Sequence, residues 1–420
     1  MRSARRVVVL GGGFAGLETA FLLKHRLREA VDVHLVTDQP NFLFRPNTIY
    51  IPFGSNPDQL LIPLREPAHR QQIALIEGAV EGVETGARLV HLRQHPPIAY
   101  DDLVIATGAA VRPAEIPGLE THAFSLWTPA DMLRLRRELE RVVERAERGK
   151  PARLLFLIPP HNQCAAPLYE LVFMTDSWLR RHHLRDLVSI TLATAESSYV
   201  QVFGSRLHEM VTAEFLDRSI SGHRGWAVRE IRPHQAVFSN GESLGFDSLI
   251  AFPPQVAAVS YRELPLDERG FIRTELGSRR VEGVPGIYAP GDAGDFPVKQ
   301  AFLAFLQADA VAEAITASVQ GTEPRVVFDP ITMCVIEQFD KAMFAQVPLR
   351  LTGDPLRPVE VRPDAGEEYK VGVSPLWRFG KKLLGVYLPM RFRAGEPFHA
   401  GAAWKMMETG LRGMSGIFAD

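Results

Sequence analysis

The sequence predicts an α/β protein with two βαβ units and a carboxy-terminal segment of different composition. Each unit is indicated by a strand pattern, a helical pattern and a second strand pattern, in that order. The first unit comprises residues 7–10, 17–27 and 31–36, and the second comprises residues 153–158, 165–181 and 188–193. Of the 420 residues, 46% are hydrophobic and 23% are charged, which is typical of a soluble globular protein of two or three domains.

Charge and cysteine content exclude several classes of protein. The formal net charge of −2 argues against a dominant nucleic-acid-binding face. Only two cysteines occur, so a disulfide-stapled secreted scaffold is excluded. We find no run of about 18–20 apolar residues that could span a bilayer, and no secretory signal pattern, so we expect a cytoplasmic protein. No His or Cys group has zinc spacing, and we predict no metal site.

A glycine fingerprint joins the first strand to the first helix. Gly11, Gly13 and Gly16 stand directly after the strand, with Phe14 and Ala15 between the last two. These glycines allow the tight turn, the approach of a pyrophosphate and close helix–strand packing, and the helix N-terminus attracts phosphate. An acid after the second strand should hold the ribose. Asp38 is the candidate, although Thr37 is an alternative for that position.

Two further motifs follow the fingerprint. Residues 100–108 form a short strand ending in Thr107 and Gly108, and residues 287–292 end in Gly291 and Asp292. The three motifs in this order resemble the FAD-dependent pyridine nucleotide–disulfide oxidoreductase superfamily. The resemblance implies two Rossmann-like domains, and it implies that Asp292 binds the ribityl chain of FAD.

The turn of the second βαβ unit lacks a glycine fingerprint. Residues 159–167 contain three prolines and no glycine. Prolines remove N–H donors and stiffen the chain, and no glycine lets a pyrophosphate approach. We therefore predict a domain that kept its fold and lost its nicotinamide site.

Cys164 stands in this turn, at the predicted helix start. A Pro-rich turn, this cysteine, Glu170 six residues later and a late Cys334 resemble sulfide:quinone oxidoreductases and flavocytochrome c sulfide dehydrogenases, as do residues 42–53, which include Arg45, and residues 254–274. The resemblance implies a Cys164/Cys334 redox pair, with Cys334 facing the flavin. A helix N-terminus lowers a thiol pKa, which favours a reactive Cys164. The alternatives are two inert core cysteines and a solvated Glu170.

Three departures from the family pattern affect the expected site. The stretch 125–128 lacks the cysteine that tethers FAD in many relatives, so FAD should be non-covalent. A histidine expected after the second strand of the second unit is missing, and Ala301 and Phe302 replace glycines. Lys299 precedes the apolar helix predicted at 300–319. By the resemblance that helix points at the flavin, and Lys299 would add positive charge there, unless it is a surface lysine.

The domain organisation follows from these motifs. We expect residues 1–115 and 245–325 to form the FAD-binding domain, with strands at 249–252 and 286–289 returning to its sheet. Residues 116–244 form the second Rossmann-like domain, and residues 326–420 form the last segment. That segment interleaves aromatic and aliphatic residues with basic ones. The members are Trp377, Arg378, Phe379, Lys381, Lys382, Leu383, Leu384, Val386, Tyr387, Leu388, Met390, Arg391, Phe392, Arg393, Trp404, Lys405, Met406, Met407 and Leu411. It is predicted to lie on an anionic membrane, on the protein's own core or on a second subunit of a homodimer.

These expectations combine into one function. The chain is predicted to oxidise sulfide, or a related small sulfur species, and to pass electrons through FAD to a membrane quinone at the cytoplasmic face. A type II NADH:quinone oxidoreductase is the nearest alternative, and cytochrome c is an alternative acceptor. A non-catalytic flavin-bearing binding protein is the alternative from another class.

Overall fold

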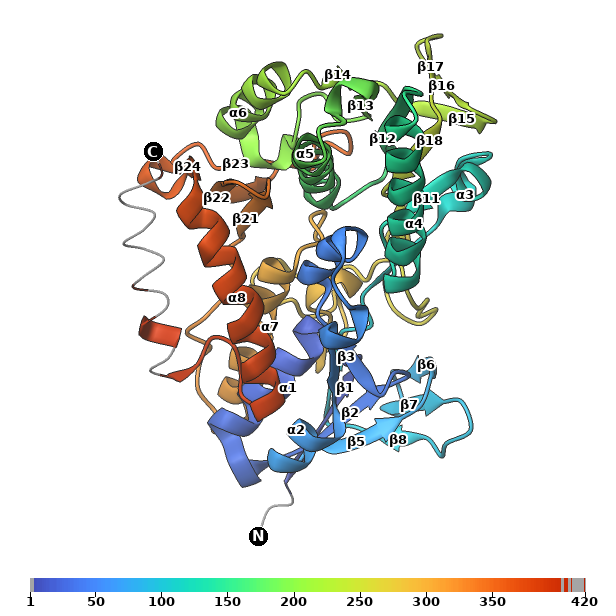
Figure 1. Cartoon of the computed structure of the whole chain (residues 1–420). Coiled ribbons are helices and arrows are strands. Elements are labelled where there is room, and N and C mark those ends of the chain that lie inside the picture. Colours follow the sequence, from blue (N-terminus) through green and yellow to red (C-terminus); the bar gives the residue numbers. More distant parts are fainter. Residues whose placement is uncertain (1–3, 402–403, 407–408, 410–418, 420) are drawn as a thin grey trace.

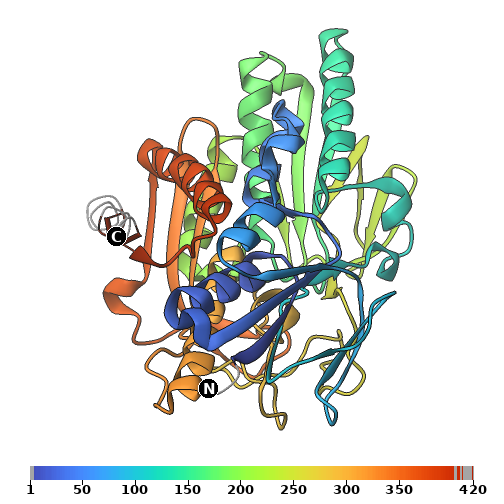
Figure 2. The same cartoon turned by 90° about the horizontal axis from the view of Figure 1, so that it is seen from below.

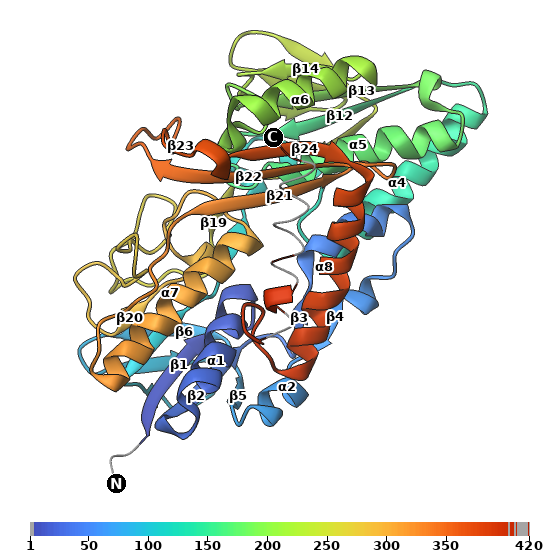
Figure 3. The same ribbon diagram turned by 90° about the vertical axis from the view of Figure 1, so that its left-hand side faces the viewer.

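The computed structural model describes residues 4–401, 404–406, 409 and 419. Two parallel sheets lie at opposite ends of the molecule, and a third, antiparallel sheet packs beside them with the long helix α8 (Figures 1 and 3).

The first sheet has the strand order β20-β9-β1-β2-β5, and all its pairs are parallel. Its strands are β1 (Arg5–Leu10), β2 (Val31–Thr37), β5 (Ala74–Glu77), β9 (Asp102–Ile105) and β20 (Ile287–Tyr288). Val7 and Val9 pack toward α1 (Phe14–Leu27) and α7 (Ala301–Gln320). Val8 and Leu10 pack toward the opposite face. Burial on both faces explains the unbroken aliphatic run of β1.

The second sheet has the order β11-β18-β12-β13-β14, again parallel. Its strands are β11 (Ala123–Ser125), β12 (Ala152–Ile158), β13 (Val188–Thr194), β14 (Ser221–Arg224) and β18 (Ser248–Ala251). The helices of this unit are α4 (Pro129–Glu147), α5 (Ala166–Arg181) and α6 (Gly204–Asp217). The core between α4, α5 and β12 is continuous with the core of the antiparallel sheet.

One expected strand lies in the other sheet. Residues 249–252 were expected in the first sheet, but β18 pairs with β11 and β12 of the second. A short aliphatic strand buried on both faces fits the middle of either parallel sheet, so its composition does not say which sheet it joins. β20, from the segment 286–289, does lie in the first sheet.

Shorter strands cover and connect the two large sheets. They are β3 (Asn41–Leu43), β4 (Leu61–Pro63), β6 (Val80–Glu84), β7 (Leu89–Leu92), β8 (Ile98–Ala99), β10 (Ala109–Val111), β15 (Val228–Arg232), β16 (Gln235–Phe238), β17 (Ser243–Gly245) and β19 (Gln255–Ala257). The short helices α2 (Arg65–Arg70) and α3 (Leu119–His122) also belong to these connections. A 3₁₀ segment, Arg45–Phe53, leaves the first unit and packs against α4 and α5 (Figure 2).

The carboxy-terminal unit is an antiparallel sheet followed by one helix. Its elements are β21 (Ile331–Glu337), β22 (Ala342–Leu351), β23 (Val359–Val361), β24 (Lys370–Ser374) and α8 (Pro375–Ala394). β21 packs on α5, and α8 runs from β24 to α2 and β4 of the first unit (Figure 3). The Trp377 ring stacks on Phe344 at 4.0 Å, which holds the start of α8 on the sheet.

The helix α7 differs from the expectation that no segment of the chain is long and apolar enough to span a bilayer. It is long and apolar enough to cross a membrane by length and composition alone, with 61% of the tested window buried inside the protein. Its many alanines keep the helix apolar while allowing α1 to pack closely against it. The burial is that of a core helix.

Candidate functional site

The three cofactor motifs meet at the carboxyl ends of the first sheet. Gly11 has φ +109°, and a Cβ there would lie 2.3 Å from the Ala106 carbonyl oxygen, next to Thr107. A Cβ on Gly291 would lie 2.9 Å from the Ala15 Cβ. The fingerprint therefore contacts both other motifs, and only glycine fits at these two contacts.

The start of α1 fits a phosphate group. The helix has no side-chain cap and no acid in its first turn, so its first N–H groups remain available. A Cβ on Gly13 would meet nothing within 4 Å, whereas a Cβ on Gly16 would lie 1.9 Å from the Gly11 carbonyl oxygen. Gly13 thus leaves open space and Gly16 permits packing. The Phe14 ring packs edge-on against Phe42 at 4.9 Å.

Two neighbouring residues occupy the end of β2. A Cβ on Gly12 would lie 3.1 Å from the Thr37 hydroxyl oxygen, so Thr37 faces the fingerprint. Asp38 follows directly and is exposed. Gly108 has φ +76° with open space around it. The sequence alternatives for the ribose-binding residue therefore both lie at the rim of the cradle.

Asp292 and Lys299 form a charged floor beside the cradle. Burial raises the pKa of Asp292, and the positive charges of Lys299 and Arg45 oppose this effect. Among the described residues, none donates a hydrogen bond to the Asp292 carboxylate, so it can accept one from a ligand hydroxyl. Lys299 is buried, donates to the Gly294 carbonyl oxygen, and lies 3.7 Å from the Phe271 ring centre. Burial lowers its pKa to about 8.

The two cysteine segments meet at the start of α7. The Lys299 amide donates to the Gln163 carbonyl oxygen at 2.9 Å, next to Cys164. The Gln300 side chain donates to the Met333 carbonyl oxygen at 2.8 Å, next to Cys334. Both cysteines are free and partly buried. The structure thus brings the sulfur-bearing segments to adjacent residues in front of one helix.

Burial dominates the protonation of both thiols. It raises the pKa of Cys164 well above its usual value, and it raises the pKa of Cys334 to about 12. The expectation that the helix start lowers the Cys164 pKa is therefore wrong for this state. The desolvation cost of a thiolate exceeds the dipole effect, since α5 begins only at Ala166. The charges of Asp292 and Cys334 add to the rise at Cys164.

Glu170 belongs to a buried ion-pair cluster beside Cys334. Its carboxylate accepts from the Glu337 amide at 3.1 Å and pairs with Lys381. Glu337 accepts from the Tyr50 hydroxyl at 2.7 Å and from Arg378 at 2.6 Å. Burial raises the pKa of Glu170, and Lys381 opposes this effect.

Most residues of this cluster were not predicted from the sequence. Tyr50 and Glu337 were not proposed, and Arg378 and Lys381 were interpreted as part of a basic surface. The available signal was their three-residue spacing, which places both on one face of α8.

Comparisons with known proteins agree with this arrangement. Residues 5–149 match the family model described as pyridine nucleotide-disulphide oxidoreductase. That part of the chain is therefore similar to pyridine nucleotide-disulphide oxidoreductases. The chain is 28% identical over 243 residues to the sulfide-quinone reductase of Aquifex aeolicus, covering 56% of this chain and 54% of that protein. It is 25% identical over 321 residues to the external alternative NAD(P)H-ubiquinone oxidoreductase B3 of Arabidopsis thaliana, covering 69% and 54%.

Both matches span about half the length of these curated relatives. The sulfide:quinone oxidoreductase structure from Aquifex aeolicus superposes with a TM-score of 0.83 at 20% identity, covering 97% of this chain and 96% of that one. The fold is therefore shared over the whole chain. Together the comparisons show that the chain has the fold of the sulfide:quinone oxidoreductase structure and is similar in sequence to part of a sulfide-quinone reductase.

The backbone amides of the second βαβ turn are hydrogen-bonded to side chains of the protein itself. The Cys164 amide donates to the Asn162 side chain at 3.0 Å, and the Gln163 amide donates to the Gln255 side chain at 2.6 Å. Asn162 in turn donates to the Phe252 carbonyl oxygen at 2.9 Å. Amides that would hold a pyrophosphate in a nicotinamide site are thus already hydrogen-bonded.

The acidic residue after β13, Glu196, already accepts hydrogen bonds from the protein itself. Glu196 accepts from the Tyr169 hydroxyl at 2.7 Å, from the Thr194 hydroxyl at 2.9 Å and from the Gln201 amide at 3.0 Å. This carboxylate is therefore committed to internal contacts, at the place where a dinucleotide ribose is held in such folds.

The helix α8 has an inner polar face and an outer apolar stripe. Arg378 and Lys381 turn inward to the Glu337–Glu170 cluster, and Arg391 pairs with Glu396. The interpretation of these three as a basic membrane face is therefore wrong, because Arg378 and Lys381 pair with buried carboxylates and the largely buried Arg391 donates to Glu396 and to the Pro397 and Ala400 carbonyl oxygens. Exposed apolar side chains do line the outside. They are Leu376, Phe379, Leu383, Val386 and Met390.

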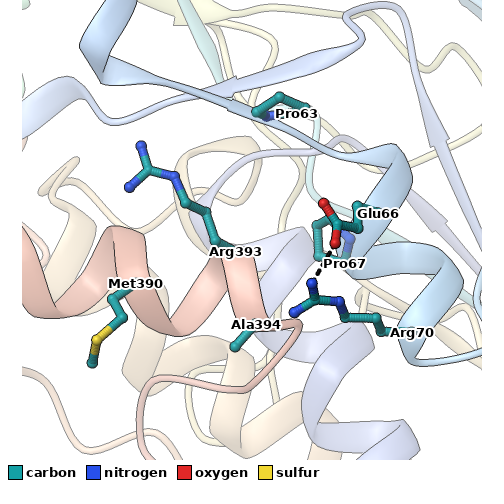
Figure 4. A pocket seen from close by; sticks show the side chains of 7 residues that line it. All are labelled: Pro63, Glu66, Pro67, Arg70, Met390, Arg393 and Ala394. Atoms are coloured by element: carbon teal, nitrogen blue, oxygen red, sulfur yellow. Dashed lines mark hydrogen bonds and ion pairs between the residues drawn. The ribbon is translucent and has the colours of Figure 1, made fainter.

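The outer stripe continues to a pocket at the far end of α8. Met390 and Arg393 line it on one side, and Pro63 and Pro67 line it on the other, beside the Glu66–Arg70 ion pair (Figure 4). None of the predicted site residues lines this pocket. In the last residues, Trp404, Lys405 and Met406 are described, whereas Met407 and Leu411 lie outside the described residues.

Proposed function

We propose that the chain is a peripheral membrane flavoprotein that oxidises sulfide, or a related small sulfur species, and reduces a quinone. Electrons would pass through Cys164 and Cys334 to non-covalently bound FAD. The observation that carries the proposal is the convergence of the two cysteine segments on residues 299–300, beside Asp292 of the cofactor cradle.

The cofactor site would use both fingerprint and floor. The α1 N-terminus, with Gly11, Gly13, Phe14, Ala15 and Gly16, would hold the pyrophosphate. Thr37 or Asp38 would hold the adenosine ribose, Thr107 and Gly108 would line the cradle, and Arg45, Gly291, Asp292 and Lys299 would contact the ribityl and flavin end. Neither cysteine lies in the stretch 125–128, which supports a non-covalent cofactor. When bound, FAD accepts two electrons from sulfur and delivers them to the quinone.

The two cysteines would work as a disulfide in the oxidised protein. Hydrosulfide attacks one sulfur of that bond, which forms a persulfide there and releases the other cysteine as a thiolate. Joining the persulfide to the thiolate as a trisulfide releases two electrons and one proton. Bound FAD would take up these two electrons and supply them to the quinone, which would take up two protons to become quinol. We assign Cys334 as the sulfur that faces the flavin.

The charges of Glu170 and Lys381 would have opposite effects on the protonation of Cys334. The charge of Glu170 raises the pKa of Cys334, whereas that of Lys381 lowers it. A paired Glu170 therefore favours the thiolate more than an unpaired one does. Glu170 would also receive the proton released at the sulfur, since burial raises the pKa of its carboxyl group.

The second βαβ turn supports sulfur over nicotinamide as the electron donor. The relatives include NAD(P)H-ubiquinone oxidoreductases, so this distinction needs a specific argument. Here the turn amides bond to Asn162 and Gln255, and Glu196 is fully engaged. A dinucleotide would have to break these hydrogen bonds before binding.

The outer stripe of α8 supports a membrane location. A row of exposed apolar side chains on a 20-residue helix fits an interfacial helix, and the quinone partitions into the same bilayer. Lys382 and Arg393 make no ion pair within the described part of the chain, and they would face anionic lipid. A homodimer seated on the same stripe is the alternative, and the cytoplasmic face of the membrane stays a prediction.

The test is anaerobic flavin absorbance with alternative donors. Purified wild-type protein receives sulfide in one sample and NADH in another, followed by a soluble quinone. We expect bleaching by sulfide alone and recovery with quinone. Cys334→Ser and Cys164→Ser should bind flavin normally and resist sulfide, while dithionite still bleaches both.

Other outcomes would overturn parts of the proposal. Bleaching by NADH would favour the NADH:quinone oxidoreductase alternative. An unchanged rate in Cys334→Ser would remove that residue from the flavin-facing role. Slow reduction by every donor, with a stoichiometric protein partner, would favour a non-catalytic flavin-bearing binding protein.

A further inference from the structure

Three potential metal ligands meet where the chain after α8 returns to the first sheet. Glu18 comes from α1, Asp309 from α7 and His399 from the segment that follows α8. One ligand atom from each lies within 4.8 Å of the other two. The His399 Nδ1 lies 2.9 Å from an Asp309 carboxylate oxygen and 3.9 Å from a Glu18 carboxylate oxygen. No metal pattern is recognisable in the sequence because these ligands are far apart along the chain.

The cluster is buried among aromatic rings. The Glu18 side chain is fully buried, and the His399 side chain is 8% exposed. The rings of Phe398 and Trp404 have centres 4.7 and 4.9 Å from the His399 ring, and Phe305 lies at 5.6 Å. Water is thus largely replaced by apolar surface, where an uncompensated charge is costly.

Negative charge in the cluster is only partly balanced. Arg26 approaches the other oxygen of the Asp309 carboxylate at 3.4 Å and shares its charge with Glu313 at 3.3 Å. Among the described residues, Glu18 accepts hydrogen bonds from two backbone amides, those of Phe398 at 2.7 Å and His399 at 3.1 Å. A cation between the ligands would balance the negative charge of the Glu18 and Asp309 carboxylates.

The histidine supplies an independent indication of a ligand. His399 Nδ1 is buried and makes no hydrogen bond, even though an Asp309 oxygen lies 2.9 Å away. Buried polar nitrogens are nearly always hydrogen-bonded. An imidazole nitrogen this close to two carboxylate oxygens, without a hydrogen bond of its own, can share a bound cation with them.

We propose that Glu18, Asp309 and His399 bind one divalent transition-metal ion of the zinc class. One imidazole nitrogen with two carboxylate oxygens suits Zn²⁺ and its analogue Co²⁺ better than Mg²⁺ or Ca²⁺, which prefer all-oxygen sites. Three protein ligands leave a fourth position for water. The ion would join α1, α7 and the segment after α8, so its role is structural and separate from the sulfur chemistry.

The test is binding of Co²⁺ to the full chain, freed of tags and pre-treated with chelator. Bound metal is counted by mass spectrometry after desalting, and visible absorbance reports the coordination of the ion. We expect one Co²⁺ per chain, displaced by Zn²⁺ and not by Mg²⁺ or Ca²⁺. His399→Gln and Asp309→Asn should bind at least about 10-fold more weakly. Glu313→Gln, one turn away on α7 and paired with the same Arg26, should bind as wild type does.

Folding and the cysteines need their own controls. Flavin content and circular dichroism must match wild type in each variant, and Asp309→Asn is the mildest change because Asp309 is partly exposed. A Cys164→Ser/Cys334→Ser protein should keep the metal, since the site contains no sulfur. Failure of the wild type to bind Co²⁺, displacement by Ca²⁺, or full retention in folded His399→Gln would overturn the proposal.

Discussion

Replacing Lys381 by methionine should destabilise the protein by about 3–5 kcal/mol, the usual effect of removing one partner from a buried ion pair. The Lys381 and Glu170 side chains are 13% and 9% exposed, so water cannot take the place of the lost ammonium. Glu170 keeps the Glu337 amide as a donor. The Val335 carbonyl oxygen loses the hydrogen bond that it accepts from the Lys381 ammonium at 3.1 Å. Methionine fills a similar volume, which isolates the charge effect from a cavity effect.

The pH dependence of this loss has a definite sign. Burial already raises the pKa of Glu170, and removal of Lys381 raises it further. At low pH the unpaired carboxyl takes up a proton and most of the cost disappears. The difference in unfolding free energy between wild type and Lys381→Met should therefore grow as the pH rises.

The assay is urea unfolding followed by flavin fluorescence and circular dichroism. Lys382→Met, at the next and exposed position of α8, should change the unfolding free energy by no more than about 0.5 kcal/mol. Lys381→Met combined with Glu170→Gln should recover most of the loss, because no buried charge is then left alone. A loss below about 1 kcal/mol, or a double variant no more stable than Lys381→Met, would refute the argument.

Three further predictions concern the cofactor, the flavin environment and the membrane. Gly13→Ala should fold normally, because the new Cβ would meet no protein atom within 4 Å, yet it should lose flavin, because the Cβ would take up space in the cradle. The loss would be seen as a lower 450 nm absorbance per protein. Gly16→Ala should fail to fold, because its Cβ would lie 1.9 Å from a carbonyl oxygen. The pKa of Lys299 is lowered to about 8, so its ammonium loses its charge as the pH rises through that value. The difference in flavin midpoint potential between wild type and Lys299→Met should therefore shrink between pH 7 and 9. A constant difference would contradict this prediction. Phe379→Glu, 64% exposed on α8, should reduce co-sedimentation with anionic vesicles about 10-fold, whereas Leu216→Glu, 84% exposed on α6, should not; equal effects would exclude α8 as the contact.

The fold could be predicted from sequence wherever the signal is local. Gly11, Gly13 and Gly16 lie within six positions of one another, and the strands and helix around them have clear periodicity. β18 was placed in the wrong sheet because a four-residue aliphatic strand carries no information about its neighbours. Sheet membership depends on long-range pairing, which no local pattern records.

The candidate site, like the fold, could be predicted from the sequence only where the signal is local. Asp292 and Cys164 could be found because each follows a recognisable strand or turn. The partners of Glu170 could not, since Glu337 comes from β21 and Lys381 from α8. A lysine that faces a buried carboxylate and one that faces lipid have the same appearance in a sequence. The protonation of Cys164 was also misjudged, because burial is a property of the assembled core.

The two faces of α8 have a practical consequence for handling the protein. The helix is about 30 Å long, and the same 20 residues carry both its inner charges and its outer stripe. Detergent or truncation that unseats the outer face would withdraw Lys381 from the neighbourhood of Cys334. The flavin cradle draws on α1, β9 and the Gly291 turn instead. Under the proposed function, a preparation could therefore keep its flavin colour and yet be inert toward sulfide, so colour alone would be a poor measure of intactness for this molecule.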